Sequence, residues 1–241
     1  MYCSPDGVVR EQGRWGTMAE VALMTPATGP PPRVARTINP GKTALRRVIL
    51  GAALVALIVV LFRAPNEVSH PPGILVPEEP FQAQADRPTP WEHNGYTFTP
   101  LAYFRLRARV LHTERYWFDE LSGVSPIDLA VGWGPMSDGR IVEQFSFSQG
   151  GRWYSWKPKN RAQPISHRDL ARYSANMHLI PATVDIDKRL RDVRAGHIVH
   201  IAGDLVAVQD KDGRKWTSSL SRTDTGGGSC EVIWVRELKV R

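Results

Sequence analysis

Cys230 and His178 are the side chains of this sequence whose types suit nucleophilic catalysis. Cys230 follows Gly226-Gly227-Gly228-Ser229, and a glycine-rich loop can expose a thiolate, with His178 or His200 as its base. Cys230 also opens the apolar run at residues 232–235, where a small buried hydrophobe is typical. Cys230 and His178 are therefore the catalytic candidates, and the setting of Cys230 favours a structural role.

Three short motifs do not meet the requirements of the chemistry that they suggest, either in their residues or in their spacing. Gly41-Lys42-Thr43 resembles the end of a phosphate-binding loop, but Arg36 stands where that loop needs a glycine. Asp224-Thr225-Gly226 matches the aspartic-protease triplet, yet it occurs once and follows no apolar strand. His197 and His200 would point to opposite faces of a strand. The sequence thus predicts no metal site and no cofactor.

Aromatic and basic side chains gather in patterns that suit binding rather than reaction. The cluster Trp153, Tyr154 and Trp156 lies among basic residues, an arrangement that favours protein interfaces or glycan stacking, although core packing is the default for a tryptophan. Arg105, Arg107 and Arg109 alternate with apolar residues and form a basic stripe on a predicted strand. The stripe is either an ordinary solvated face or a site for an acidic partner.

Asn176 and His178 form a polar segment between apolar ones, just before Pro181. Such residues either line a pocket or are buried polar groups that bond to one another. Together with the aromatic cluster and the basic stripe, they complete the predicted binding residues.

An apolar run at residues 48–62 predicts a transmembrane helix over 46–63. The run is shorter than the roughly 20 residues that span a bilayer, but the flanking Arg47 and Arg63 can extend it with their aliphatic stems. A cleaved signal peptide is the alternative, although no small-residue cleavage site follows. Either interpretation sends the rest of the chain across the membrane.

Charge places the N-terminus inside. Residues 1–47 carry a net charge of +4 out of the total of +7, as the positive-inside rule expects of a cytoplasmic tail. The remainder is only mildly basic, so we expect no nucleic-acid partner. The two cysteines, Cys3 and Cys230, then lie on opposite sides of the membrane and cannot pair within one chain, which leaves Cys230 as a lone thiol.

The chain therefore divides into four predicted segments. These are a disordered cytoplasmic tail (1–45), the transmembrane helix or signal anchor (46–63), a Pro-rich extracytoplasmic spacer (64–94) and a β-rich extracytoplasmic domain (95–241).

Short alternating segments in the last part predict a mainly β (α+β) domain, a small barrel or sandwich. Expected strands are 104–110, 141–148, 153–156, 197–202, 205–209, 215–220 and 231–240, with short helices from Ser166 to about residue 174 and at 185–193. Turns are expected at Gly150-Gly151, Gly203-Asp204 and Asp212-Gly213. Residues 196–216 have a spacing similar to that of OB-like barrels, which implies no ligand.

These features favour a non-catalytic, membrane-anchored module for a partner protein or envelope component. Its location would be the cytoplasmic (inner) membrane, with the C-terminal domain outside, and its partners the membrane and a membrane or envelope protein complex. The alternative is a small envelope hydrolase or transferase that uses Cys230 with a nearby histidine, so enzymatic activity stays open.

Overall fold

The computed structural model describes residues 45, 47–54, 67–85, 88–161, 164–221 and 229–241. Contacts divide the chain into two compact units, and all of the described strands belong to the unit that contains residues 66–241. Residue 45 and residues 47–54 are helical. No helix among the described residues has the length and apolar character that a membrane crossing needs. Most of the predicted tail and span lies outside the described residues, so both stay predictions.

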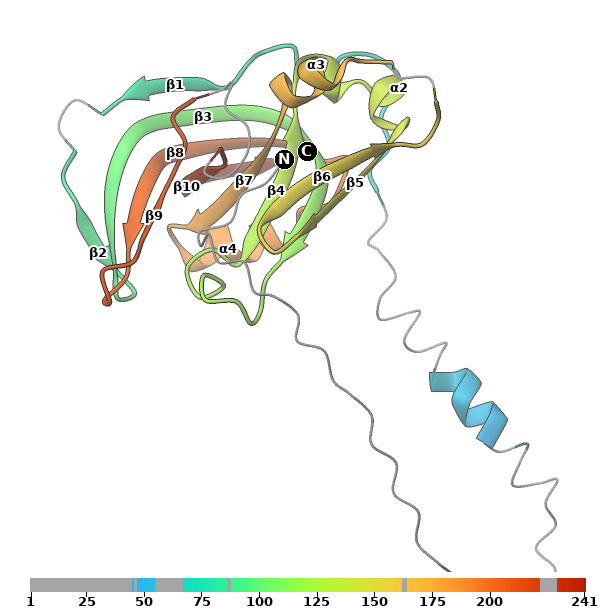
Figure 1. The fold of residues 1–241 in the computed structure, drawn as a ribbon, viewed down its shortest axis with the longest axis horizontal. Coiled ribbons are helices and arrows are strands. Elements are labelled where there is room, and N and C mark those ends of the chain that lie inside the picture. Colours follow the sequence, from blue (N-terminus) through green and yellow to red (C-terminus); the bar gives the residue numbers. More distant parts are fainter. Residues whose placement is uncertain (1–44, 46, 55–66, 86–87, 162–163, 222–228) are drawn as a thin grey trace, which may run out of the picture. The chain divides into compact units, whose positions relative to one another are not determined.

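Five strands form a closed ring. They are β3 (Tyr96–Arg115), β4 (Ile127–Gly132), β7 (Ser174–Pro181), β10 (Glu231–Val240) and β8 (Ile198–Gln209). Each pairs with the next in that order, and β8 pairs back with β3. All of these pairs are antiparallel except β7 with β10. The long β3 pairs with β4 and β8 because two bulges, near Pro100 and near Val110, bend it (Figure 1).

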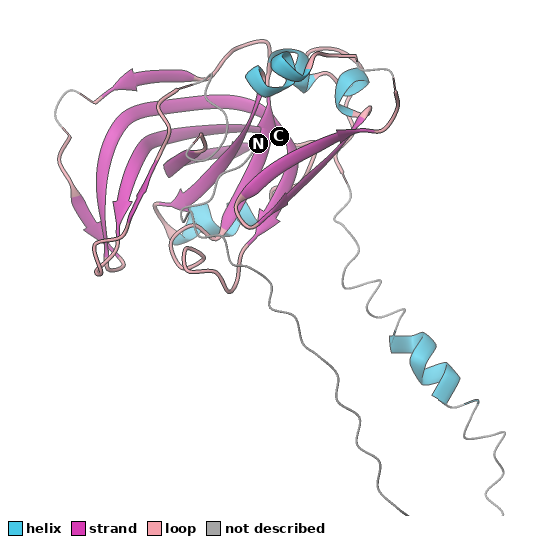
Figure 2. Ribbon diagram, in the orientation of Figure 1, coloured by secondary structure: helices cyan, strands magenta, loops and turns pink. Residues whose placement is uncertain are grey.

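Shorter elements extend and cover the ring (Figure 2). β1 (Phe81–Gln84) and β2 (Trp91–His93) pair with β3, and β9 (Lys215–Thr217) pairs with β8. A separate hairpin of β5 (Phe145–Gly150) and β6 (Trp153–Pro158) lies between β4 and β7 in the sequence. The helices are η1 (Gly134–Ser137), α2 (Gly139–Val142), α3 (His167–Arg172) and α4 (Val184–Arg191).

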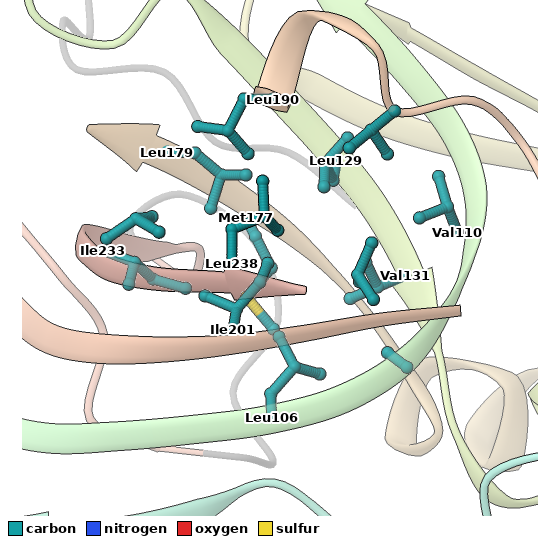
Figure 3. Close-up of a cluster of buried hydrophobic side chains, with 14 of the residues drawn as sticks. Leu106, Val110, Leu129, Val131, Met177, Leu179, Leu190, Ile201, Ile233 and Leu238 are labelled. Carbon is teal, nitrogen blue, oxygen red and sulfur yellow. The ribbon is translucent and has the colours of Figure 1, made fainter. Parts of the chain in front are cut away.

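The core fills the inside of the ring. Alternate residues of each strand point inward, and Figure 3 shows Leu106 and Val110 of β3 facing Leu129 and Val131 of β4. Leu190 of α4 joins the same cluster. Burial of this apolar surface is the main stabilising term, at about 25 cal/mol for each Å² removed from water.

Several predicted elements are confirmed. The domain is mainly β, the strand at 231–240 is correct, and the strand at 104–110 lies within β3. Ser166 caps α3, with its Oγ accepting a hydrogen bond from the backbone N of Asp169 at 3.0 Å. Asp212-Gly213 lies in the turn between β8 and β9.

Other elements differ from the prediction. Ile141 and Val142 belong to α2, so β5 begins only at Phe145. β4 was not predicted, and Asn176 and His178 lie in β7 rather than in an irregular segment. Gly203-Asp204 is no turn, because β8 runs through it as one strand.

The predicted spacer is largely part of the domain. Val76 is fully buried in the core, and its carbonyl accepts a hydrogen bond from Gly134 N at 2.7 Å. Gly73 N donates to the carboxylate of Asp138, whose pKa is lowered to about 2 mainly by its hydrogen bonds to Arg140. Within the described residues, contacts with the domain therefore extend back to residue 68, before the predicted boundary at residue 95.

Gly203 lets β10 cross close to β8, which generates a first prediction. A Cβ at this position would lie 1.9 Å from the carbonyl oxygen of Trp234, which is backbone and cannot move aside. We expect Gly203→Ala to lower the free energy of unfolding by about 3 kcal/mol or more, measured by urea denaturation. Gly123→Ala is the control, because its Cβ would meet no atom within 4 Å. Equal stability of the two variants would contradict the close crossing.

Candidate functional site

A group of buried polar side chains lies on the outer surface of β4 and β7. Ile127 and Leu129 point into the core, so Asp128 between them points outward. By the same alternation Asn176 and His178 point outward from β7. All three polar side chains are nevertheless buried, because the β5–β6 hairpin, the β3–β4 loop (residues 116–126) and β9 cover this surface.

Arg152 is the centre of this group. It occupies the turn of the β5–β6 hairpin, where Gly151 and Arg152 both have positive φ, at 56° and 68°. A left-handed arginine costs roughly 1–2 kcal/mol, so its side-chain contacts must hold it there. The guanidinium is buried and lies 3.7 Å above the ring of Tyr116.

The Arg152 guanidinium joins three parts of the fold. Its Nε and Nη2 donate to the two carboxylate oxygens of Asp119 at 2.8 and 2.9 Å, a bidentate pair with the β3–β4 loop. Nη1 donates to Oδ1 of Asp128 on β4 at 2.9 Å. Nη2 also donates to the carbonyl of Ser125 at 2.8 Å. The hairpin, the loop and the ring are thus fixed to one another by one side chain.

Asp128 also lies against His178. Nδ1 of His178 is 2.8 Å from Oδ2 of Asp128, and both side chains are buried. Burial raises the pKa of Tyr116, which keeps its hydroxyl protonated and able to donate to Asp128. The ring of His178 packs 4.9 Å from that of Trp216 on β9. The fully buried carboxylate of Asp128 therefore lies between the guanidinium of Arg152 and the ring of His178.

Asn176 links Arg152 to Cys230. Its Nδ2 donates to the backbone carbonyl of Arg152 at 3.3 Å and lies 3.8 Å from the sulfur of Cys230. Its Oδ1 contacts the amide of Gln149, which in turn reaches the ring of His112. A polar chain thus runs from β3 across the hairpin to β10.

A cleft of about 290 Å³ opens beside Arg152. Its walls come from the β3–β4 loop, the hairpin turn and the β8–β9 turn, and include Tyr96, Asp119, Glu120, Arg152, Arg214 and Trp216. Arg214 bridges the rim, with ion pairs to Glu120 at 2.9 Å and to Asp210 at 2.7 Å. The cleft combines aromatic surface with charges of both signs.

The predicted binding residues fall in different places. Asn176 and His178 lie in the buried polar group, whereas Tyr154 packs in the cluster beneath the hairpin and Trp156 contacts the ring of His167. Trp153 is half-buried at the start of β6. Their role in binding stays a prediction, and only Asn176 and His178 adjoin the cleft region.

The arginine stripe is split by the structure. Arg105 and Arg107 are exposed, with Arg105 over the ring of Phe81 and Arg107 3.9 Å from Glu78. Arg109 is buried, which lowers its pKa, and its Nη1 donates to the carbonyl of Ser137 at 3.4 Å. The three side chains therefore do not form one uniform surface.

Cys230 is buried, and it is disulfide-bonded rather than a free thiol. The prediction of a lone thiol is wrong at this position, whereas Cys3 lies outside the described residues, as do Gly41-Lys42-Thr43 and Asp224-Thr225-Gly226. A sulfur held in a disulfide provides no thiolate to attack a substrate. The described residues also contain no group of three or more His, Cys, Asp or Glu placed to hold a metal ion.

Sequence reasoning missed Asp128, Arg152 and Trp216. One signal for Asp128 was present, since it is the single charge in the apolar run Ile127–Gly132. A lone carboxylate in a buried strand requires a buried partner. Nothing local identifies Arg152 as that partner.

Comparisons with models of known protein families, with curated proteins and with solved structures found no match to this chain.

Removal of the Arg152 guanidinium tests its structural role. Arg152→Met leaves the buried carboxylate of Asp128 without its cation, so we expect a loss of about 3–5 kcal/mol in the free energy of unfolding. Arg152→Lys should lie between this variant and the wild type, because an ammonium cannot pair bidentately with Asp119 while it also bonds to Asp128. Urea denaturation measures both variants.

Arg214→Met is the matched control for Arg152. Its ion pairs are exposed, and such pairs contribute about 1 kcal/mol or less. A loss as small at Arg152 as at Arg214 would contradict the central role of Arg152.

Proposed function

We propose that this chain is a membrane-anchored, non-catalytic module that binds a partner protein or envelope component in the cleft beside Arg152. The observation that carries the proposal is the construction of the cleft. Its walls are a loop and two turns, which are elements that often move. Here, however, Arg152 fixes the hairpin turn and the β3–β4 loop to the ring. A preformed site loses less conformational entropy on binding than a flexible one.

The order of strands supports the location of this site. Along the chain, the five ring strands are β3, β4, β7, β8 and β10. They pair in the order β3, β4, β7, β10, β8 and back to β3, which is first, second, third, fifth, fourth and first. This order is similar to that of OB barrels, which bind ligands on the second and third strands and on the loops after the first and fourth. In this chain those parts are β4, β7, the β3–β4 loop and the β8–β9 turn. Because fold alone does not determine function, the proposal rests on the residues that form the cleft.

The chemistry of the cleft favours binding over catalysis. The Arg152 guanidinium is occupied by Asp119, Asp128 and Ser125, and the His178 ring is buried between Asp128 and Trp216. Aromatic surface combined with charged side chains, as in this cleft, is typical of protein interfaces.

Charge reversal at the rim tests the binding site. We expect full-length protein, taken from gently solubilised membranes, to recover a partner in near-equal amount. Lys215→Glu combined with Glu120→Arg should reduce that recovery at least tenfold, because both residues line the cleft and are exposed. Lys239→Glu, exposed on β10, is the control and should recover the partner as the wild type does. Recovery of no partner, or equal recovery by all variants, would contradict the proposal.

The proposed topology has its own test. A reporter enzyme that works only outside the cytoplasm should be active when fused after Arg241, and the protein should resist alkaline extraction from membranes. Peptide mapping under non-reducing conditions adds a second measurement. A bond between Cys230 and Cys3 of the same chain would contradict an N-terminus on the other side of the membrane.

A further inference from the structure

The tip of the β3–β4 loop exposes two adjacent aromatic side chains. Trp117 is 62% exposed and Phe118 is 100% exposed, the highest value among the large hydrophobic residues of the described chain. The loop beneath them is well fixed, because Tyr116 N donates to Pro126 O at 2.9 Å and Asp119 bonds to Arg152. We call Trp117 and Phe118 the aromatic tip. It protrudes from an ordered base, so its exposure is a fixed property of the fold.

One arginine contacts the aromatic tip, and two more lie at the end of β3 and just beyond α4. The guanidinium of Arg191, at the end of α4, lies 5.5 Å from the ring of Trp117. Arg115 donates to the backbone carbonyl of Arg191, and Arg194 is exposed just beyond α4. An apolar tip among cations suits a surface that has an apolar interior and anionic groups at its edge.

The aromatic tip lies on the same part of the domain as residues 68–70, where the described chain enters the domain. Val68 N donates to Ala195 O at 2.9 Å, and the ring of His70 lies 2.7 Å from Gly196 O. Ala195 follows Arg191 by four residues, which covers at most about 14 Å.

We propose that the aromatic tip inserts into the lipid surface of the membrane that anchors the chain. Trp117 and Phe118 would enter the headgroup and acyl boundary, and Arg115, Arg191 and Arg194 would contact lipid phosphates. This inference rests on the anchor in the proposed function. The predicted span ends near Arg63, and Val68 is five residues further on, so at most about 18 Å of chain separates the domain from the bilayer.

A lipid surface fits the aromatic tip better than a partner protein does. A protein partner would need a pocket to receive a fully exposed phenylalanine, whereas a bilayer accepts an aromatic side chain at any point of its surface. The short tether already holds this side of the domain near lipid, which lowers the entropy cost of the contact.

Site-specific photo-cross-linking of the full-length protein tests the inference. Phe118 is replaced by p-benzoyl-phenylalanine, and the protein is reconstituted into vesicles of phosphatidylcholine and phosphatidylglycerol at 3:1. The control carries the same group at Phe81, which is 49% exposed on β1. We expect lipid adducts, measured by mass spectrometry, to be at least tenfold more abundant at position 118 than at position 81.

Flotation of the vesicles after an alkaline wash separates the possible outcomes. Protein that floats but forms no more lipid adduct at 118 than at 81 would overturn the inference and leave the anchor intact. Cross-links from 118 to a second protein chain would overturn it in favour of a protein interface. Protein that does not float would overturn the anchor, and the inference with it.

Discussion

The pairing of Arg152 with Asp128 fixes the β5–β6 hairpin and the β3–β4 loop on the outer surface of β4 and β7. Each of the two side chains is buried, and the cost of removing either charge from water is offset only by the other and by the hydrogen bonds around them. The pairing joins a two-residue turn to a strand 24 positions away along the chain. A buried ion pair contributes little net stability over an apolar packing of the same shape, so its effect is mainly to specify one position for the hairpin.

That specificity explains how a small domain acquires a rigid cleft. The β5–β6 hairpin has only one neighbouring strand for each of its strands, and an isolated hairpin is marginally stable in water. Two contacts hold it on the ring: the apolar cluster around Tyr154 and Ala130, and the polar contacts of Arg152. The apolar cluster provides most of the burial energy but little direction. The polar contacts provide the direction, and through Asp119 they set the β3–β4 loop that forms the opposite wall.

The sequence predicts the parts of this fold that local pattern determines. β3 and β10 were accessible because their apolar residues alternate or run together, and α3 because Ser166 is a strong cap. β4 and β7 were missed, and these two strands carry the site. Polar residues interrupt the apolar pattern of β7 at Asn176 and His178, and they do so because their partners come from the hairpin and from β4. The arrangement of the site thus depends on pairings between distant residues, which no local window contains.

The N-terminal part of the domain is a second place where the local sequence pattern does not determine the structure. Seven prolines in residues 64–92 indicate an extended segment, and composition alone cannot distinguish a free spacer from a strap that is bonded to a domain. The backbone groups of Leu75 and Val76 bond to Oγ of Ser137, so the segment is a strap. A spacer would have allowed the domain to stand away from a bilayer and to turn freely. A strap removes that freedom from residues 73–76, because the ring and its helices fix their backbone.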